Sequence, residues 1–205
     1  ERYFRLRDTI SCYVADTPSF LIEAIGQNKR ILFEGAQGSL LDIDHGTYPF
    51  VTSSNTVSAQ AAIGSGIGPQ HLHVIVGIIK AYTTRVGSGP FPTELKDATG
   101  DLLRERGCEF GATTGRPRRC GWLDLPVIRH AANINGLTHL AVTKLDVLSG
   151  LQRIRVCTGY RYQGETLSVM PTQLSVLSAC EPIYQEFKGW EKELNDIQRF
   201  DDLPA

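Results

Sequence analysis

Apolar residues recur with helical spacing in three segments of the chain. In residues 16–28, apolar side chains fall on one face, behind a capping position at Asp16 or Thr17. Residues 95–106 form a second predicted helix, which Gly107 closes. The third predicted helix has its cap, its first-turn proline and its terminal glycine at Asp124, Pro126 and Gly136.

Continuous apolar runs outside these helices predict strands. Residues 31–34 and 74–86 are expected to be buried strands, and residues 140–142 form the third strand. Residues 153–162 and 166–169 alternate around a Gln-Gly turn, which predicts an antiparallel hairpin. Strands that alternate with helices indicate the α/β class. The predicted fold is therefore a mostly parallel central sheet with flanking helices plus an antiparallel hairpin.

The composition is that of a globular protein, since 41% of the 205 residues are hydrophobic and 21% are charged. The net charge of −1 provides no global basic field for nucleic acid or an anionic membrane. The five cysteines are odd in number and never form a C-x-x-C pair, which argues against a disulfide framework or a structural zinc site. Because no apolar stretch is long enough to span a bilayer and no signal-peptide core is found, we expect a cytoplasmic protein without nucleic-acid or membrane partners.

A charged tetrapeptide, Thr143-Lys144-Leu145-Asp146, ends the third apolar run. A carboxylate at a strand end, such as that of Asp146, can accept hydrogen bonds from the ring N–H and the exocyclic amine of guanine together. Adenine lacks this pair of donors, so the acceptor would go unpaired, and discrimination on the order of 10⁴ follows. The Lys144 stem can lie along the base or ribose while its ammonium stays in water. The alternative reading is a surface-charged turn.

The strongest candidate anion site is the loop Ala112-Thr113-Thr114-Gly115-Arg116-Pro117-Arg118-Arg119. Its guanidinium groups, preceded by two hydroxyls, can bind a dicarboxylate or phosphates through bidentate bonds. Gly115 permits close backbone approach, and Pro117 stiffens the loop. The alternatives are a solvated basic turn and a minor-groove DNA hook with a Gly-Arg-Pro core. The apolar helix that follows and the slightly negative net charge argue against DNA.

Two earlier segments carry neutral hydrogen-bonding groups. Gln37 follows the first apolar run in a glycine turn, and its carboxamide can both donate to and accept from a purine edge. The hydroxyl-rich run that begins at Thr52 can donate to a phosphate, although such runs also form caps and turns. Asp42, Asp44 and His45 can be read as metal ligands, but Asp pairs at this spacing are more typical of Asx turns.

In chain order, these segments closely resemble the adenylosuccinate synthetase family, in register from about residue 10 to the end. The matching blocks are Phe33-Glu34-Gly35-Ala36-Gln37-Gly38, Asp42-Ile43-Asp44-His45-Gly46-Thr47-Tyr48-Pro49, Val51-Thr52-Ser53-Ser54-Asn55, Gly89-Pro90-Phe91-Pro92-Thr93-Glu94, Thr113-Thr114-Gly115-Arg116 with Gly121-Trp122, and Thr143-Lys144-Leu145-Asp146.

The resemblance implies a P-loop NTPase-like fold and a GTP-dependent ligase of de novo AMP biosynthesis. The family joins inosine monophosphate (IMP) to L-aspartate, using GTP and Mg²⁺. GTP first phosphorylates the purine O6, and the aspartate amine then displaces phosphate, which gives adenylosuccinate, GDP and phosphate. The resemblance further implies a cytoplasmic homodimer.

Position by position, the resemblance assigns Gln37 and Thr52 to IMP, with Thr52 at its phosphate. The substrate-binding loop comprises Ala112, Thr113, Thr114, Gly115, Arg116, Pro117 and Arg118. Within it, Thr113, Thr114 and Arg116 are expected toward the aspartate carboxylates, and Arg116 also toward the nucleotide ribose.

The resemblance assigns the remaining positions to GTP. Arg118 is expected to approach GTP, and Lys144, Leu145 and Asp146 match the guanine-recognition segment. For Asp146 and for the arginine loop, this assignment agrees with the charge argument from the residues alone.

The chain departs from the family pattern most severely in length, which is roughly half the usual one. The family's N-terminal phosphate loop, its Asp general base, its His acid and its magnesium ligands have no counterpart here, nor has the last segment of the guanine pocket. The stretch Ser58-Ala59-Gln60-Ala61-Ala62 also replaces a glycine-containing one. We therefore expect residues 1–205 to form a single incomplete domain, without catalytic residues or metal ligands of its own and inactive alone. The alternative is a non-catalytic guanine-nucleotide-binding module.

Overall fold

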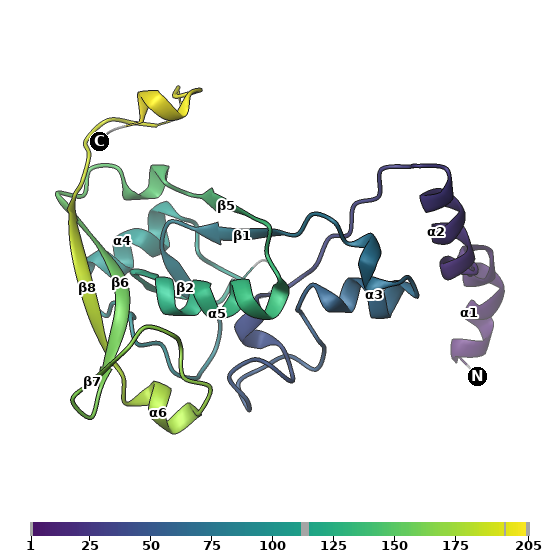
Figure 1. Ribbon diagram of the computed structural model, residues 1–205, viewed down its shortest axis with the longest axis horizontal. Coiled ribbons are helices and arrows are strands. Elements are labelled where there is room, and N and C mark those ends of the chain that lie inside the picture. Colours follow the sequence, from purple (N-terminus) through teal and green to yellow (C-terminus); the bar gives the residue numbers. More distant parts are fainter. Residues whose placement is uncertain (1, 112–114, 195, 204–205) are drawn as a thin grey trace.

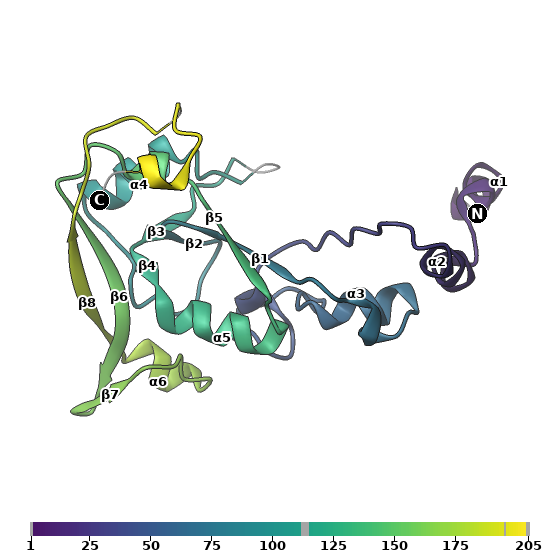
Figure 2. The same ribbon diagram turned by 45° about the horizontal axis from the view of Figure 1, so that its top comes forward.

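The computed structural model describes residues 2–111, 115–194 and 196–203. Its strands gather in one α/β body, and two N-terminal helices extend away from this body at one end (Figures 1 and 2). These two are α1 (Arg2–Ile10) and α2 (Thr17–Gly26). The C-terminal residues lie at the opposite end of the molecule (Figure 1). No helix in the described ranges is both long and apolar enough to cross a membrane.

The strands form three small sheets. In the first, β1 (Val76–Lys80) pairs in parallel with β5 (His139–Thr143), and in the second, β2 (Thr83–Arg85) pairs antiparallel with β3 (Arg119–Gly121). The third is built around one long strand, to which one neighbour is parallel and two are antiparallel. Its members are β6 (Arg153–Tyr162), the parallel β4 (Leu123–Asp124), and the antiparallel β7 (Glu165–Leu167) and β8 (Glu181–Lys188).

The α/β class is confirmed, because parallel and antiparallel pairs occur together with flanking helices. The expected hairpin is β6–β7, whose turn residues Gln163 and Gly164 have φ values of 49° and 86°. Positive φ at both central positions is the geometry that matches the twist of a tight hairpin. Antiparallel pairing nevertheless extends beyond this hairpin, since β8 follows β6 along most of its length.

Two further predicted helices begin at capping side chains. α5 (Leu125–Asn135) starts at Asp124, whose Oδ1 accepts a hydrogen bond from the Val127 N–H at 3.2 Å. α4 (Ala98–Arg106) starts three residues later than expected, because the Asp97 carboxylate accepts from the Thr99 and Gly100 N–H groups. Within the described ranges there are also two shorter helices, α3 (Ala59–Ser65) and α6 (Leu174–Ser178).

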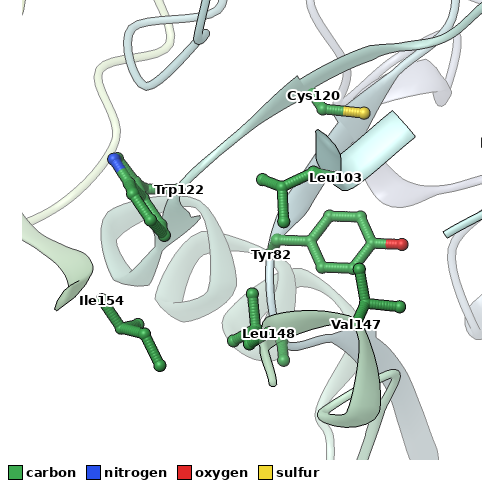
Figure 3. Close-up of a cluster of buried hydrophobic side chains, with 8 residues drawn as sticks. Tyr82, Leu103, Cys120, Trp122, Val147, Leu148 and Ile154 are labelled. Atoms are coloured by element: carbon green, nitrogen blue, oxygen red, sulfur yellow. The ribbon is translucent and has the colours of Figure 1, made fainter. Parts of the chain in front are cut away.

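The main hydrophobic core lies where β2, β3, α4 and the segment after β5 meet (Figure 3). Its central members include Tyr82, Leu103 and Trp122, which are 2%, 0% and 7% exposed. Burying a large apolar side chain stabilises a fold by roughly 1.5–3 kcal/mol. The core also contains Val147 and Leu148, so it fixes the backbone that directly follows Asp146.

Two of the strand predictions are wrong. Residues 31–34 are extended but belong to no strand, and Leu32 is 88% exposed. The predicted strand 74–86 is divided into β1 and β2, and Ile78 in β1 is 77% exposed rather than buried. A buried strand needs neighbours on its edges and faces, and the described residues provide β1 with β5 alone. Apolar composition indicated the strand tendency but not which partners would be present.

Several described elements were not predicted, namely α1, α3, α6, β3, β4 and β8. α3 consists mainly of small residues without a periodic apolar face, so it has no helical signal in the sequence. β8 contains Pro182, which normally marks an edge or an interruption of a strand. Pro182 lies opposite Tyr160 of β6, near the start of β8.

Candidate functional site

The segment after β5 presents Asp146 at the protein surface. Lys144 has a left-handed backbone, with φ of 60°, and turns the chain into the short 3₁₀ helix Asp146–Leu148. Leu145 packs against the main core, whereas Asp146 is exposed. These residues border an open hollow of about 260 Å³, which is lined by Val142, Lys144, Leu145, Asp146, Leu194, Ile197 and Leu203. Asp146 thus lies shortly after the end of β5 and borders an open hollow.

The arginine loop leaves the body beside α4 and returns as β3. Phe110 and Pro117 form an antiparallel bridge at its base, and the Gly111 N–H donates to the Arg116 carbonyl at 2.9 Å. Gly115 has φ of 63°, a backbone conformation that favours glycine. The predicted residues Ala112, Thr113 and Thr114 lie outside the described residues. Of the others, Gly115, Arg116 and Pro117 are exposed, and Arg118 is half-buried.

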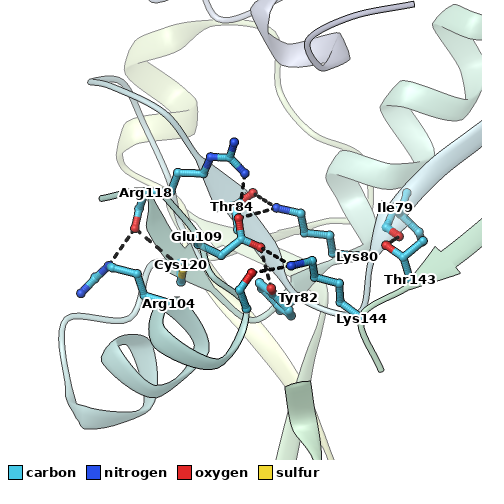
Figure 4. A network of polar contacts seen from close by, with 11 residues as sticks. Ile79, Lys80, Tyr82, Thr84, Arg104, Glu109, Arg118, Cys120, Thr143 and Lys144 are labelled. Carbon is cyan, nitrogen blue, oxygen red and sulfur yellow. Dashed lines mark hydrogen bonds and ion pairs between the residues drawn. The ribbon is translucent and has the colours of Figure 1, made fainter. Parts of the chain in front are cut away.

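One buried carboxylate connects the arginine loop to the segment after β5 (Figure 4). Glu109 is only 1% exposed, and its Oε2 lies 2.8 Å from Arg118 Nη1 and 2.7 Å from Lys80 Nζ. Its Oε1 accepts a hydrogen bond from the Tyr82 hydroxyl at 2.6 Å and lies 3.8 Å from Lys144 Nζ. We call Glu109, Lys80, Tyr82, Arg118 and Lys144 the Glu109 cluster.

The electrostatics of the cluster favour an ionised Glu109. Burial acts to raise the pKa of Glu109, but the bonds from Lys80 and Tyr82 lower it, so that its pKa lies below the usual value. Burial and the Glu109 carboxylate together raise the pKa of Tyr82, and the negative charge of Asp146 raises it further. The single negative charge of Glu109 therefore faces the three cations Lys80, Arg118 and Lys144, so the net charge of the cluster is positive. Among the described residues, the buried Nε of Arg118 meets no hydrogen-bond acceptor.

A second buried carboxylate organises the loop that contains Thr52. Asp42 is completely buried and accepts hydrogen bonds from the Asp44, His45, Thr56 and Val57 N–H groups and from the Asn55 amide. Burial acts to raise the pKa of Asp42, but these backbone bonds hold it at about 2. The Asx-turn interpretation of this segment is therefore confirmed. The described residues contain no group of three or more His, Cys, Asp or Glu side chains placed to bind a metal.

Arg85 attaches this loop to the body. Its Nη2 donates to Thr47 Oγ1 at 2.7 Å and to the Phe50 carbonyl at 3.3 Å, while its Nε donates to the Ser88 carbonyl at 3.0 Å. Burial, and then repulsion from Arg119, lower the pKa of Arg85. Arg85 lies opposite Arg119 in the β2–β3 register, so the loop is anchored next to the strand that follows Arg118.

The structure thus brings Arg118 and Lys144 to one carboxylate, with Leu145 and Asp146 adjoining. Gln37 and Thr52 belong to a different part of the chain. Gln37 is exposed with φ of 63°, and Thr52 is half-buried, with its N–H bonded to the Leu41 carbonyl at 2.8 Å. Sequence reasoning missed Glu109, Lys80 and Tyr82 of the cluster, and Arg85 beside it. Only the fold reveals that Glu109 and Arg85 are buried, at 1% and 7% exposed.

The described residues have an α/β architecture and form part of a P-loop NTPase-like fold. A family model for adenylosuccinate synthetase matches residues 1–205. The chain belongs to the adenylosuccinate synthetase family.

Individual relatives support this assignment. The adenylosuccinate synthetase of Desulforudis audaxviator is 55% identical over 205 residues, which are 100% of this chain and 48% of the relative. The adenylosuccinate synthetase of Desulfosudis oleivorans is 55% identical over 202 residues, which are 98% of this chain and 47% of the relative. The structure of fully ligated adenylosuccinate synthetase from Plasmodium falciparum matches with a TM-score of 0.95 and 42% identity, covering 98% of this chain and 49% of that one. The chain spans about half the length of the curated relatives that it matches.

Proposed function

We propose that residues 1–205 are an internal-to-C-terminal part of an adenylosuccinate synthetase and form a single incomplete domain. The relatives are about twice as long. The two-stranded sheet β1–β5 also leaves Val76, Ile78, Leu140 and Val142 between 47% and 77% exposed. Parallel strands are normally covered on both faces. The proposal explains this exposure, because the rest of the polypeptide would cover the sheet.

The complete polypeptide would join IMP to L-aspartate at the expense of GTP. In this proposal Gln37 and Thr52 contact IMP, and residues 112–118 bind aspartate, with Arg118 also toward GTP. Lys144, Leu145 and Asp146 recognise guanine. The observation that carries the proposal is the Glu109 cluster, since one carboxylate holds a residue of the arginine loop and a residue of the guanine segment together.

We further propose that the Mg²⁺ ligands and the catalytic acid and base lie in the part of the polypeptide outside these residues. What this chain contributes is charge and position. The surplus positive charge of the cluster attracts anionic substrates, and Asp146 selects the base. On the family resemblance, we also propose a homodimer in the cytoplasm.

The test compares the isolated chain with a hybrid, in which the chain replaces the matching half of the Desulforudis audaxviator synthetase. With IMP, aspartate, GTP and Mg²⁺, the hybrid should give the absorbance change of adenylosuccinate formation, and the isolated chain should not. Turnover by the isolated chain would refute the assignment as an incomplete domain. A hybrid that binds GDP tightly and produces no adenylosuccinate would instead support a non-catalytic guanine-nucleotide-binding module.

A further inference from the structure

The proposed function assigns no substrate to Glu109 itself, although this buried carboxylate contacts Lys80, Tyr82, Arg118 and Lys144. It lies in the segment between α4 and β3, three residues after the end of α4. A carboxylate is seldom fully buried unless it is paired. Here the pairing comes from three separate parts of the chain, namely Lys80 at the end of β1, Arg118 before β3 and Lys144 after β5.

Glu109 holds Arg118 at two points. Its carboxylate pairs with the guanidinium at 2.8 Å, and its carbonyl accepts a hydrogen bond from the Arg118 N–H at 2.9 Å. The two contacts fix both the backbone and the side chain of Arg118, and they close the base of the arginine loop. The Glu109 N–H is itself bonded to the Arg104 carbonyl at 2.9 Å, so the attachment point belongs to α4 rather than to the loop.

Glu109 also restrains Lys144. The Lys144 ammonium donates to the Gly107 carbonyl and lies 3.8 Å from Glu109 Oε1. Lys144 is a non-glycine residue with φ of 60°, a conformation that is sparsely populated and persists when the surroundings determine it. Because Lys144 sets the direction of the chain into Asp146, its anchoring at Glu109 also orients the proposed guanine acceptor.

We propose that Glu109 is a positioning residue that couples the arginine loop to the guanine-recognition segment, so that aspartate binding and GTP binding reinforce each other. This inference rests on the proposed function. An ordered Arg118 lowers the cost of ordering the arginine loop around aspartate, and an ordered Lys144 lowers that of presenting Asp146 to guanine. Since both depend on one carboxylate, the substrate that orders one side favours the other.

The test uses Glu109→Gln in the hybrid enzyme, with Tyr160→Phe as the matched control. Both substitutions alter a buried hydrogen bond to a carboxylate, but Tyr160 donates to Asp124, outside the cluster, so that Tyr160→Phe leaves Glu109 and its three cations in place. Glu109→Gln should raise the KM for GTP and the KM for aspartate, each by about 10-fold or more, because charge-assisted bonds are lost. Tyr160→Phe should lower the melting temperature and leave both KM values within about 2-fold.

The coupling has its own readout. In the unsubstituted hybrid, saturating aspartate and IMP should tighten GDP binding measured by titration calorimetry, and Glu109→Gln should abolish this dependence. If Glu109→Gln changes only the melting temperature, or if Tyr160→Phe reproduces its effect on both KM values, the positioning role is refuted. If the unsubstituted hybrid shows no turnover, the proposed function fails, and the positioning role of Glu109 is then decided by GDP affinity alone. Equal GDP affinity in the unsubstituted and Glu109→Gln hybrids, or no GDP binding by either, would overturn the positioning role.

Discussion

The buried pair Asp124–Tyr160 makes stability depend on pH in a direction that is unusual for an aspartate. Asp124 is 1% exposed, and its two oxygens each lie 2.7 Å from the Tyr160 hydroxyl. Burial raises the pKa of Asp124 to about 6 from its ordinary 3.8, although the Tyr160 hydroxyl and the Val127 N–H oppose the shift. The folded protein therefore binds a proton at Asp124 more tightly than the unfolded chain does.

The sign and size of the effect follow from proton linkage. Between pH 3.8 and about 6 the folded state holds more protons at Asp124 than the unfolded state, so the free energy of unfolding falls as pH rises. A shift of about 2 units at about 1.4 kcal/mol each gives a loss of about 3 kcal/mol. The contribution is fully present below pH 3.8 and is lost above about pH 6.

Asp124→Asn isolates this contribution. The carboxamide oxygen can still cap α5 and accept from Tyr160, but it does not titrate. Urea unfolding of the complete polypeptide, followed by the fluorescence of the buried Trp122, should show the pH-dependent loss in the unsubstituted protein. The difference in unfolding free energy between the two proteins should change by about 3 kcal/mol from pH 4 to pH 7. A difference that stays constant over this range would refute the raised pKa of Asp124.

Two further predictions concern the other carboxylates. Asp42→Asn should lower the free energy of unfolding by about 3 kcal/mol at pH 7, since the charged acceptor of five hydrogen bonds is lost. Because the pKa of Asp42 is held at about 2, the stability that it provides is present above pH 3.8 and lost on acidification toward pH 2, which acid unfolding of the two proteins will measure. Asp146→Asn in the hybrid should raise the KM for GTP by about 100-fold and leave the KM for aspartate unchanged, because one acceptor of the guanine donor pair is lost. Steady-state kinetics with each substrate varied will check this, and equal increases in both constants would contradict guanine recognition by Asp146.

Local sequence signals sufficed where a structure depends on neighbours in the chain. The Asp124 cap, the Pro126 first turn and the Gly136 terminus of α5 were all predictable, because each acts within a few residues. The β6–β7 hairpin was predictable for the same reason. The exposure of residues 31–34 and 74–86 was not predictable, because burial of a strand depends on partners distant in sequence. For β1 the described residues provide a single partner strand, β5.

The candidate site divides in the same way. Arg118, Lys144 and Asp146 could be proposed from the sequence, because each belongs to a charged cluster with a recognisable pattern. Glu109 could not, since its importance comes from Lys80, Arg118 and Lys144, which are separated from it by 29, 9 and 35 positions. A buried carboxylate is costly until its cations are in place. The cluster can therefore form only when β1, α4, β3 and β5 have assembled, which makes it a product of the tertiary fold. Mutations that disturb this assembly should affect the arginine loop and the segment after β5 at once, whereas changes confined to the Asp42 loop should leave the cluster unaffected.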